Sequence, residues 1–144
     1  MSNFKLDLAR GKKGETLLLE RFPTLVPTDG RQYDFVTPSG LKLETKFDST
    51  KYTNIFIEII SNSNKQSPGG CYQSLLKGVD LFVYVFERDN STHCYRVDEL
   101  CWFLFKTKGQ YDLKRVKNKT YESHGYAIPI EDLKHLEISL ESVL

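Results

Sequence analysis

The chain has 144 residues, of which 40% are hydrophobic, and its nine Phe and eight Tyr are enough to fill one core, so we expect a single domain spanning 1–144. The formal net charge is only +1, which by itself predicts no attraction to nucleic acid. No stretch approaches the roughly 18 consecutive apolar residues that cross a bilayer, and the N-terminus lacks the apolar run of a secretion signal, so we expect a cytoplasmic protein with no membrane partner.

A helix is the first element that the sequence predicts. The range 6–22 has helical composition with an apolar stripe, and a proline follows it, which cannot continue a helix. Two glycines weaken the first half, so the helix is expected to start between Leu6 and Lys12. Glu15 therefore lies on an early helix.

A β-hairpin follows this helix. An extended run over 32–36 leads through a turn at 37–40 into a strand over 41–48. The second strand alternates strictly, with apolar side chains and a threonine on one face and charged side chains on the other. Glu44 and Lys46 therefore project from the same, charged face.

A strand, a helix and a second strand are predicted next. After a strand over 54–60, Ser67 and Pro68 suit the N-cap and first position of a helix, and Gly78 suits its C-terminal stop. The apolar range 79–86 is typical of a central strand that is covered on both faces. This passage implies a right-handed parallel crossover within an otherwise antiparallel sheet.

The C-terminal third adds smaller elements. We expect a partner strand over 93–97, a short helix capped by Asp98, a basic loop or ribbon, and a closing strand over 126–128 with a helix over 133–136. The expected fold class is therefore α/β, with a mixed central β-sheet flanked by helices in the order αβββαβ plus C-terminal additions.

Four polar residues of the first helix and the hairpin suit phosphodiester hydrolysis. That reaction needs charge on the phosphate to be neutralised and water to be delivered in line, and a magnesium ion held by carboxylates can do both. Asp34 lies on the strand before Glu44 and Lys46, and the helix can bring Glu15 over the open, charged side of the sheet. An ammonium group there can position the nucleophile or stabilise the developing charge. Glu15, Asp34, Glu44 and Lys46 are therefore the candidate catalytic residues.

An acid two residues before a lysine is a weak motif by itself. About two such triplets are expected by chance in a chain of this size. Asp112 and Asp132 each begin another one. Those two fall in a basic loop and an acidic terminal helix, whereas the Glu44 triplet lies on an amphipathic strand that follows another acid-bearing strand. The prediction depends on this context.

The arrangement resembles the PD-(D/E)XK nuclease superfamily, which includes restriction enzymes and phage or archaeal Holliday-junction resolvases. The match covers roughly residues 8 to 87, and its pieces are Glu15, Asp34 and Glu44-Thr45-Lys46. The family's proline before the aspartate is Tyr33 here. The resemblance implies a restriction-endonuclease-like fold and a Mg²⁺ cofactor that Mn²⁺ can replace. It also implies Asp34, Glu44, the Thr45 carbonyl and Glu15 as metal ligands, with Lys46 assisting the attacking water.

Further candidates lie outside this group. Glu58 interrupts an apolar strand and is either an additional site carboxylate or the partner of a surface lysine. The aromatic residues Trp102, Phe103 and Phe105 favour a core or dimer contact over a base-stacking platform. Two basic clusters are either solvated surface or a nucleic-acid contact. Their residues are Lys12, Lys13, Lys114, Arg115, Lys117 and Lys119.

The sequence thus predicts a Mg²⁺-dependent DNA endonuclease, a phosphodiester hydrolase that acts as a homodimer because cutting two strands calls for two sites. Compact size favours a resolvase of branched DNA or a small phage nuclease, active in a host cytoplasm if a phage encodes it, over restriction-like or nicking activity. RNA cleavage stays open. The alternatives are a non-cleaving nucleic-acid-binding module on a nuclease scaffold, and a metal-free interaction protein in which Glu44 and Lys46 form a surface ion pair.

Overall fold

A computed structural model describes residues 3–29, 32–48 and 54–144, with side chains from Lys12 onward. The helices are α1 (Asn3–Arg21), α2 (Gly70–Leu76), α3 (Val97–Lys106) and α4 (Ile130–Leu133), with the 3₁₀ turns η1 (Lys134–Leu136) and η2 (Leu140–Val143). The strands are β1 (Val26–Pro27), β2 (Phe35–Val36), β3 (Lys42–Asp48), β4 (Asn54–Asn62), β5 (Ser67–Pro68), β6 (Leu81–Phe86), β7 (Thr92–Arg96), β8 (Leu113–Lys117), β9 (Glu122–Pro129) and β10 (Glu137–Ile138). No helix in these ranges combines the length and hydrophobicity that spanning a bilayer requires.

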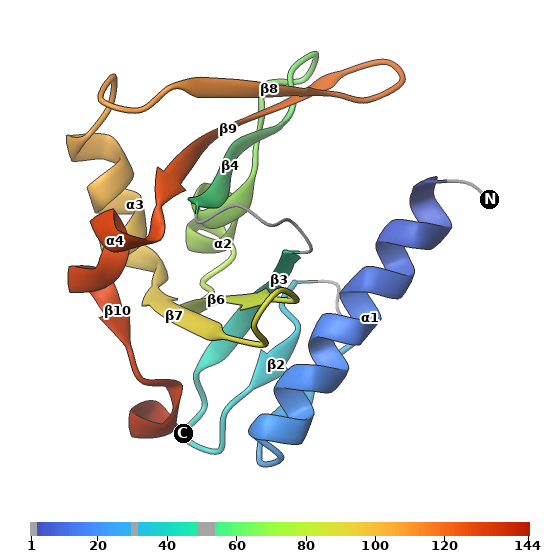
Figure 1. The fold of residues 1–144 in the computed structure, drawn as a ribbon, viewed down its shortest axis with the longest axis vertical. Coiled ribbons are helices and arrows are strands. Elements are labelled where there is room, and N and C mark those ends of the chain that lie inside the picture. The colour runs from blue at the N-terminus through green and yellow to red at the C-terminus, as the bar shows by residue number, and fades with distance from the viewer. Residues whose placement is uncertain (1–2, 30–31, 49–53) are drawn as a thin grey trace.

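The strands form two sheets, whereas the sequence predicted one central sheet (Figure 1). The first has the order β1-β2-β3-β6-β7-β10 and the second β5-β4-β9-β8. β3 and β6 pair in parallel and the other strand pairs are antiparallel, so a mixed α/β fold with one parallel crossover is confirmed. The expectation of a single sheet is wrong. β4 pairs with β9 in the second sheet, and in the first sheet β6 is the strand that pairs with β3.

α1 covers one face of the first sheet. It begins at Asn3, before the expected range, so its glycines do not delay its start. Leu18 of α1 packs in one buried cluster with Leu43 of β3. Gly14 permits this close approach, because a Cβ atom there would lie only 2.7 Å from the Phe47 Cβ. α1 is therefore seated on the apolar face of β3.

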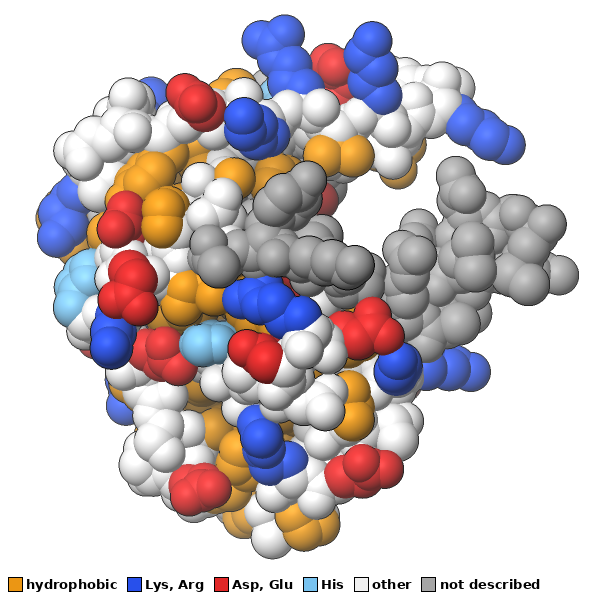
Figure 2. Space-filling view, viewed as in Figure 1, with side chains coloured by type: hydrophobic (Ala, Val, Ile, Leu, Met, Phe, Trp, Pro, Cys, Tyr) orange, Lys and Arg blue, Asp and Glu red, His pale blue; other side chains and the backbone are white. Residues whose placement is uncertain are grey.

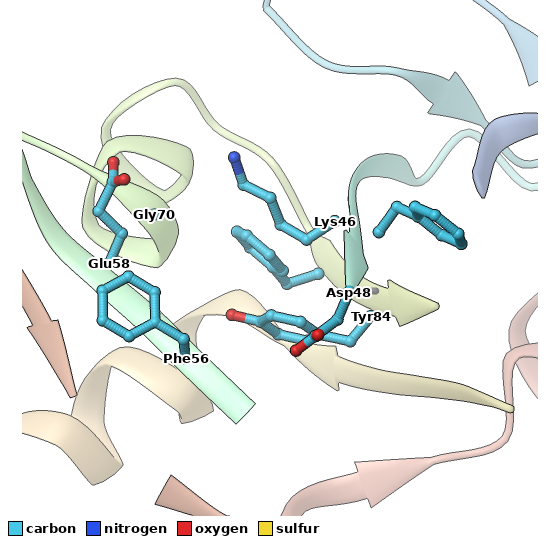
Figure 3. Close-up of a pocket in the computed structure, with 8 residues that line it drawn as sticks. Lys46, Asp48, Phe56, Glu58, Gly70 and Tyr84 are labelled. Carbon is cyan, nitrogen blue, oxygen red and sulfur yellow. The ribbon is translucent and has the colours of Figure 1, made fainter. Parts of the chain in front are cut away.

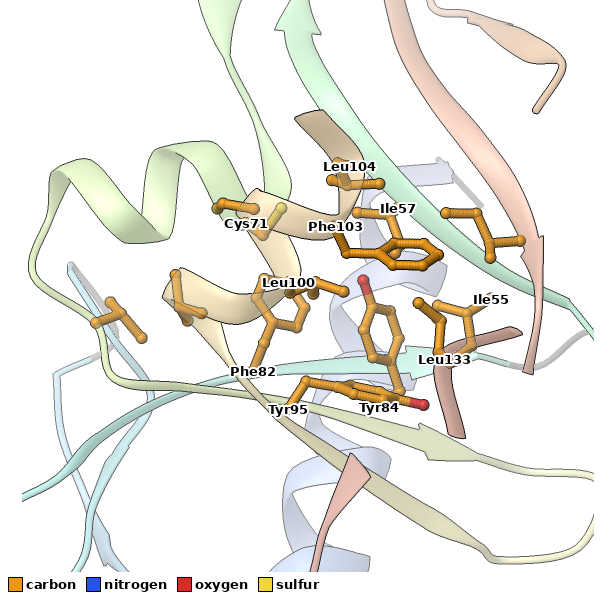
Figure 4. Close-up of a cluster of buried hydrophobic side chains, with 14 of the residues drawn as sticks. Ile55, Ile57, Cys71, Phe82, Tyr84, Tyr95, Leu100, Phe103, Leu104 and Leu133 are labelled. Carbon is orange, nitrogen blue, oxygen red and sulfur yellow. The ribbon is translucent and has the colours of Figure 1, made fainter. Parts of the chain in front are cut away.

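The opposite face of the first sheet packs against β4 and α3 (Figure 4). Phe82 and Tyr84 of β6 join Ile55 and Ile57 of β4 and Leu100 of α3 in a second buried cluster. Every residue of β6 is buried. The prediction that this strand is covered on both faces is thus confirmed, and β3 lies beside it, between the same two layers.

The ends of α2 and α3 differ from the prediction. Ser67–Pro68 form β5 and not the start of α2, whose N-cap is Gly69, because the extended pairing with β4 takes these two residues. Gly78 follows α2 with φ +73°, which confirms it as the C-terminal stop. Asp98 lies in the first turn of α3 and does not cap it, since Arg96 is the N-cap.

The C-terminal additions include a two-stranded ribbon. The basic segment forms β8, which pairs antiparallel with β9, so the ribbon alternative is correct. The closing strand is longer than predicted, and the expected helix over 133–136 is instead α4 followed by η1. On α3, Phe103 belongs to the core, whereas Trp102 and Phe105 are 57% and 65% exposed and stack on each other.

Candidate active site

The candidate residues gather at the edge of β3, where β2 ends. β2 pairs with β3 at two positions only. Beyond them the Asp34 N–H donates to the Leu43 carbonyl over 2.8 Å. The Asp34 Oδ2 then accepts hydrogen bonds from the Thr45 N–H at 2.9 Å and the Thr45 hydroxyl at 2.8 Å. These bonds fix the Asp34 carboxylate beside Glu44 and Lys46.

Three carboxylates influence one another at this edge. Burial, followed by the charge of Asp34, raises the pKa of the Glu44 carboxyl to about 7, and Glu15 adds to the rise. Partial burial and then the charge of Asp34 raise the pKa of Glu15 as well. The three acids that the sequence selected therefore lie near enough for their charges to interact, although they come from α1, the residue before β2, and β3.

Glu15 reaches this edge by a different route from the one predicted. α1 packs against the face of β3 that carries Leu43 and Phe47. Glu44 and Lys46 alternate to the opposite face. Glu15 therefore approaches around the open edge of β3, and the expectation of a helix over the charged face is not met, because the apolar stripe of α1 needs the apolar face of the strand.

The three acids alone do not form a complete set of metal ligands. Within the described ranges, no group of three or more His, Cys, Asp or Glu side chains is placed to hold a metal ion. Mg²⁺ does not require one, since it usually keeps several waters and binds one or two carboxylates together with substrate phosphates. The donors at this edge fit that mode.

Two features of these donors support the fit. The raised pKa of Glu44 shows that negative charge in this half-buried place is not fully compensated, which a cation would relieve. The Thr45 N–H points outward to Asp34, and the carbonyl of a strand residue points to the same side as its N–H. The Thr45 carbonyl oxygen is therefore directed toward the carboxylates.

Lys46 lies on the charged face between Glu44 and Glu58. Its charge lowers the pKa of both carboxyl groups, although burial leaves the pKa of Glu58 raised overall. Figure 3 shows Lys46 and Glu58 reaching into one cavity, which has a volume of about 360 Å³. The sequence left open whether Glu58 faces the site, and the structure places it across this cavity from Lys46.

The predicted nucleic-acid-binding residues fall into two groups. Lys12 and Lys13 are exposed on α1, and Lys13 Nζ lies 2.6 Å from the Glu87 carboxylate. The others are all exposed on β8 and the turn after it: Lys114, Arg115, Lys117 and Lys119. Figure 2 shows basic side chains standing along the top of the molecule, where Figure 1 places β8 and β9. The ribbon is therefore an accessible basic arm, whereas Lys13 is already paired.

Sequence reasoning missed three residues near the site. Lys77, next to the end of α2, lowers the pKa of Glu44. Tyr84 lies beside Lys46 in the parallel ladder, and Phe56 lines the cavity with both. Only Tyr84 had a signal in the sequence, because its hydroxyl is a polar group in an otherwise apolar strand. The other two residues could not be found from the sequence, because long-range strand pairing decides which residues lie near Lys46.

No protein-family model matches this sequence, and a search of curated proteins finds no match. Membership of the PD-(D/E)XK superfamily therefore stays a prediction. Function is inferred from the residues and their geometry.

Proposed function

We propose that this chain is a Mg²⁺-dependent endonuclease that hydrolyses phosphodiester bonds in DNA, on a restriction-endonuclease-like scaffold. The observation that carries the proposal is that the charges of Glu15, Asp34 and Glu44 interact beside Lys46 at the open edge of β3. A half-buried carboxyl with a pKa of about 7 beside two other acids is unfavourable when ionised. Such perturbed groups gather at functional sites more often than elsewhere.

Each residue has a separate role in the proposal. Asp34, Glu44 and the Thr45 carbonyl hold Mg²⁺, with Glu15 completing the site directly or through water. The bound ion supplies charge neutralisation at the scissile phosphate. Lys46 orients the attacking water and stabilises negative charge on the phosphate. Its ammonium suits this role because it forms no ion pair with any residue that the structure describes.

The basic ribbon supports nucleic acid as the substrate. Exposed lysines and arginines bind backbone phosphates and position a nucleic acid without reading its sequence. Branched DNA is the favoured target within this proposal, as the resemblance to Holliday-junction resolvases implies. A homodimer in the cytoplasm of the cell, or of a host, would provide two sites for two strands.

Cleavage assays test the proposal directly. Purified protein is incubated with a four-way junction, plasmid, single-stranded DNA and RNA, with Mg²⁺, Mn²⁺ or a chelator. We expect metal-dependent cutting of DNA, and Lys46→Ala and Asp34→Ala to lower the cleavage rate by about 100-fold or more. Lys134→Ala is the matched control, since it removes an exposed lysine from η1 and should leave the rate unchanged.

The outcome separates the candidate functions. A wild-type protein that binds DNA but cuts none of these substrates with either metal contradicts the endonuclease proposal and supports a non-cleaving binding module. Cutting of RNA alone would contradict the choice of DNA. Equal cutting by wild type and both site variants would contradict the assigned residues.

A further inference from the structure

We propose that the cavity between β3, β4 and β6 receives one unpaired nucleobase of a bound nucleic acid. The inference rests on the proposed function only in taking nucleic acid as the ligand. Its volume of about 360 Å³ lies at the lower end of the range for small-molecule pockets, which suits a single ring system. It lies between the two sheets, so we expect it to take a single base that has left its stack.

The walls of this cavity are largely aromatic. Phe82 and Tyr84 stack with their ring centroids 5.0 Å apart and line one side. Phe56 faces Tyr84 across the cavity in Figure 3. Its ring lies over Gly125 of β9, where a Cβ atom would come within 2.6 Å of the Phe56 Cζ. Phe82 and Tyr84 are almost fully buried and close the inner wall, so the partly exposed ring of Phe56 is the one whose π-face a nucleobase can stack on.

The polar groups of the cavity favour particular bases. Figure 3 shows the Lys46 ammonium, from β3, and the Glu58 carboxylate, from β4, facing the cavity from opposite sides. The Glu58 carboxylate lines the cavity with its Oε1 beside Gly69, and no hydrogen bond to it is found among the described residues. A carboxylate accepts hydrogen bonds from amino groups, which adenine, cytosine and guanine carry and thymine lacks. We therefore expect amino-bearing bases to be preferred.

The cavity is continuous with the candidate active site through Lys46. This residue lines the cavity and also influences the pKa of Glu44 at the edge of β3. A base held against Phe56 in this cavity would thus leave its own backbone close to the ammonium group. An unpaired nucleotide, as found in branched or bulged DNA, would be positioned beside the cleaving residues.

Binding measurements without cleavage test this inference. Fluorescence anisotropy in chelator compares a duplex that carries one bulged guanine with the fully paired duplex and with a duplex whose bulge is abasic. We expect the bulged guanine to be bound about 5-fold or more tightly, and bulged thymine less tightly than bulged guanine. Equal affinity for the three duplexes would overturn the inference.

Variants identify the cavity as the source of the preference. Phe56→Ala should abolish the preference for a bulged base, and Phe56→Leu, which keeps apolar volume but removes the ring, should weaken it even if the alanine variant does not fold. Glu58→Gln should reduce the discrimination between guanine and thymine, because the amide adds a donor. Phe105→Ala is the matched control, since this ring is exposed on α3. An unchanged preference in the folded Phe56 variant contradicts the assignment.

The two proposals can fail separately. Metal-dependent cutting without any preference for a bulged base overturns the nucleobase cavity and leaves the endonuclease. A preference that is weakened in Phe56→Leu, with no cutting under any condition, supports the cavity and overturns the endonuclease.

Discussion

The two faces of β3 are used in opposite ways. On one face Leu43 is fully buried and packs with Leu18 of α1. On the other face Glu44 is half-buried among acids, with a pKa raised to about 7. One strand therefore stabilises the fold on one side and carries an electrostatic cost on the other. Such a cost is expected where a site is kept for binding or chemistry.

Removing packing from the apolar face should have the largest effect on stability. Leu43→Ala leaves a cavity between α1 and the first sheet, so we expect the free energy of unfolding to fall by about 2–5 kcal/mol. Urea denaturation followed by circular dichroism measures it. Val26→Ala, at a residue that is 57% exposed, is the control and should change little. A loss for Leu43→Ala as small as that of the control would contradict the comparison.

Removing charge from the other face should have the opposite sign. Glu44 titrates near pH 4.5 when unfolded and near 7 when folded, so the folded protein binds more protons between these values and stability falls as pH rises through this window. Glu44→Gln should therefore raise the free energy of unfolding by about 1–3 kcal/mol at pH 8 and by less at pH 5. Denaturation in chelator at both pH values measures this. An equal rise in the free energy of unfolding at pH 5 and pH 8 would show that burial of the Glu44 charge does not cause the stabilisation.

Magnesium should relieve the same cost in the wild type. At pH 8, Mg²⁺ at about ten times its dissociation constant should raise the free energy of unfolding by about 1.4 kcal/mol. Glu44→Gln should show a smaller rise, because one ligand is lost. Thermal unfolding with and without the metal measures the shift. An identical shift in both proteins would place metal binding elsewhere.

Surface charge on α1 should matter least. The Lys13 and Glu87 side chains remain 56% and 40% exposed, so their ion pair is screened by solvent. Lys13→Ala should lower the free energy of unfolding by about 0–1 kcal/mol, and high salt should remove the difference. Denaturation at low and high salt checks both points. A larger or salt-independent loss would mean that Lys13 packs as well as pairs.

Local patterns predicted much of the fold. Strict alternation correctly placed Glu44 and Lys46 on one face of β3. The apolar run at 79–86 correctly predicted a strand buried on both sides, which is β6. The second sheet was not foreseen, because β4 and β9 are distant in the sequence and no local signal pairs them. The start of α2 was misplaced for a related reason, since pairing with β4 overrode a good capping sequence at Ser67.

The sequence predicted which residues form the candidate site better than it predicted how they are arranged. The sequence selected Glu15, Asp34 and Glu44, which the fold brings together, but not the side from which Glu15 arrives. The cavity beside Lys46 could not be predicted, because Tyr84 reaches it through parallel pairing and Phe56 through the second sheet. The catalytic roles of these residues stay predictions.

The parallel ladder between β3 and β6 has a consequence for synthesis. Every candidate catalytic residue lies at or before Lys46, yet the strand that carries two of them is held in place by Leu81–Phe86. A parallel partner cannot be supplied by a tight turn, so it comes from a distant part of the chain. A nascent polypeptide with only its first half outside the ribosome would display all four side chains while lacking the strand that arranges them.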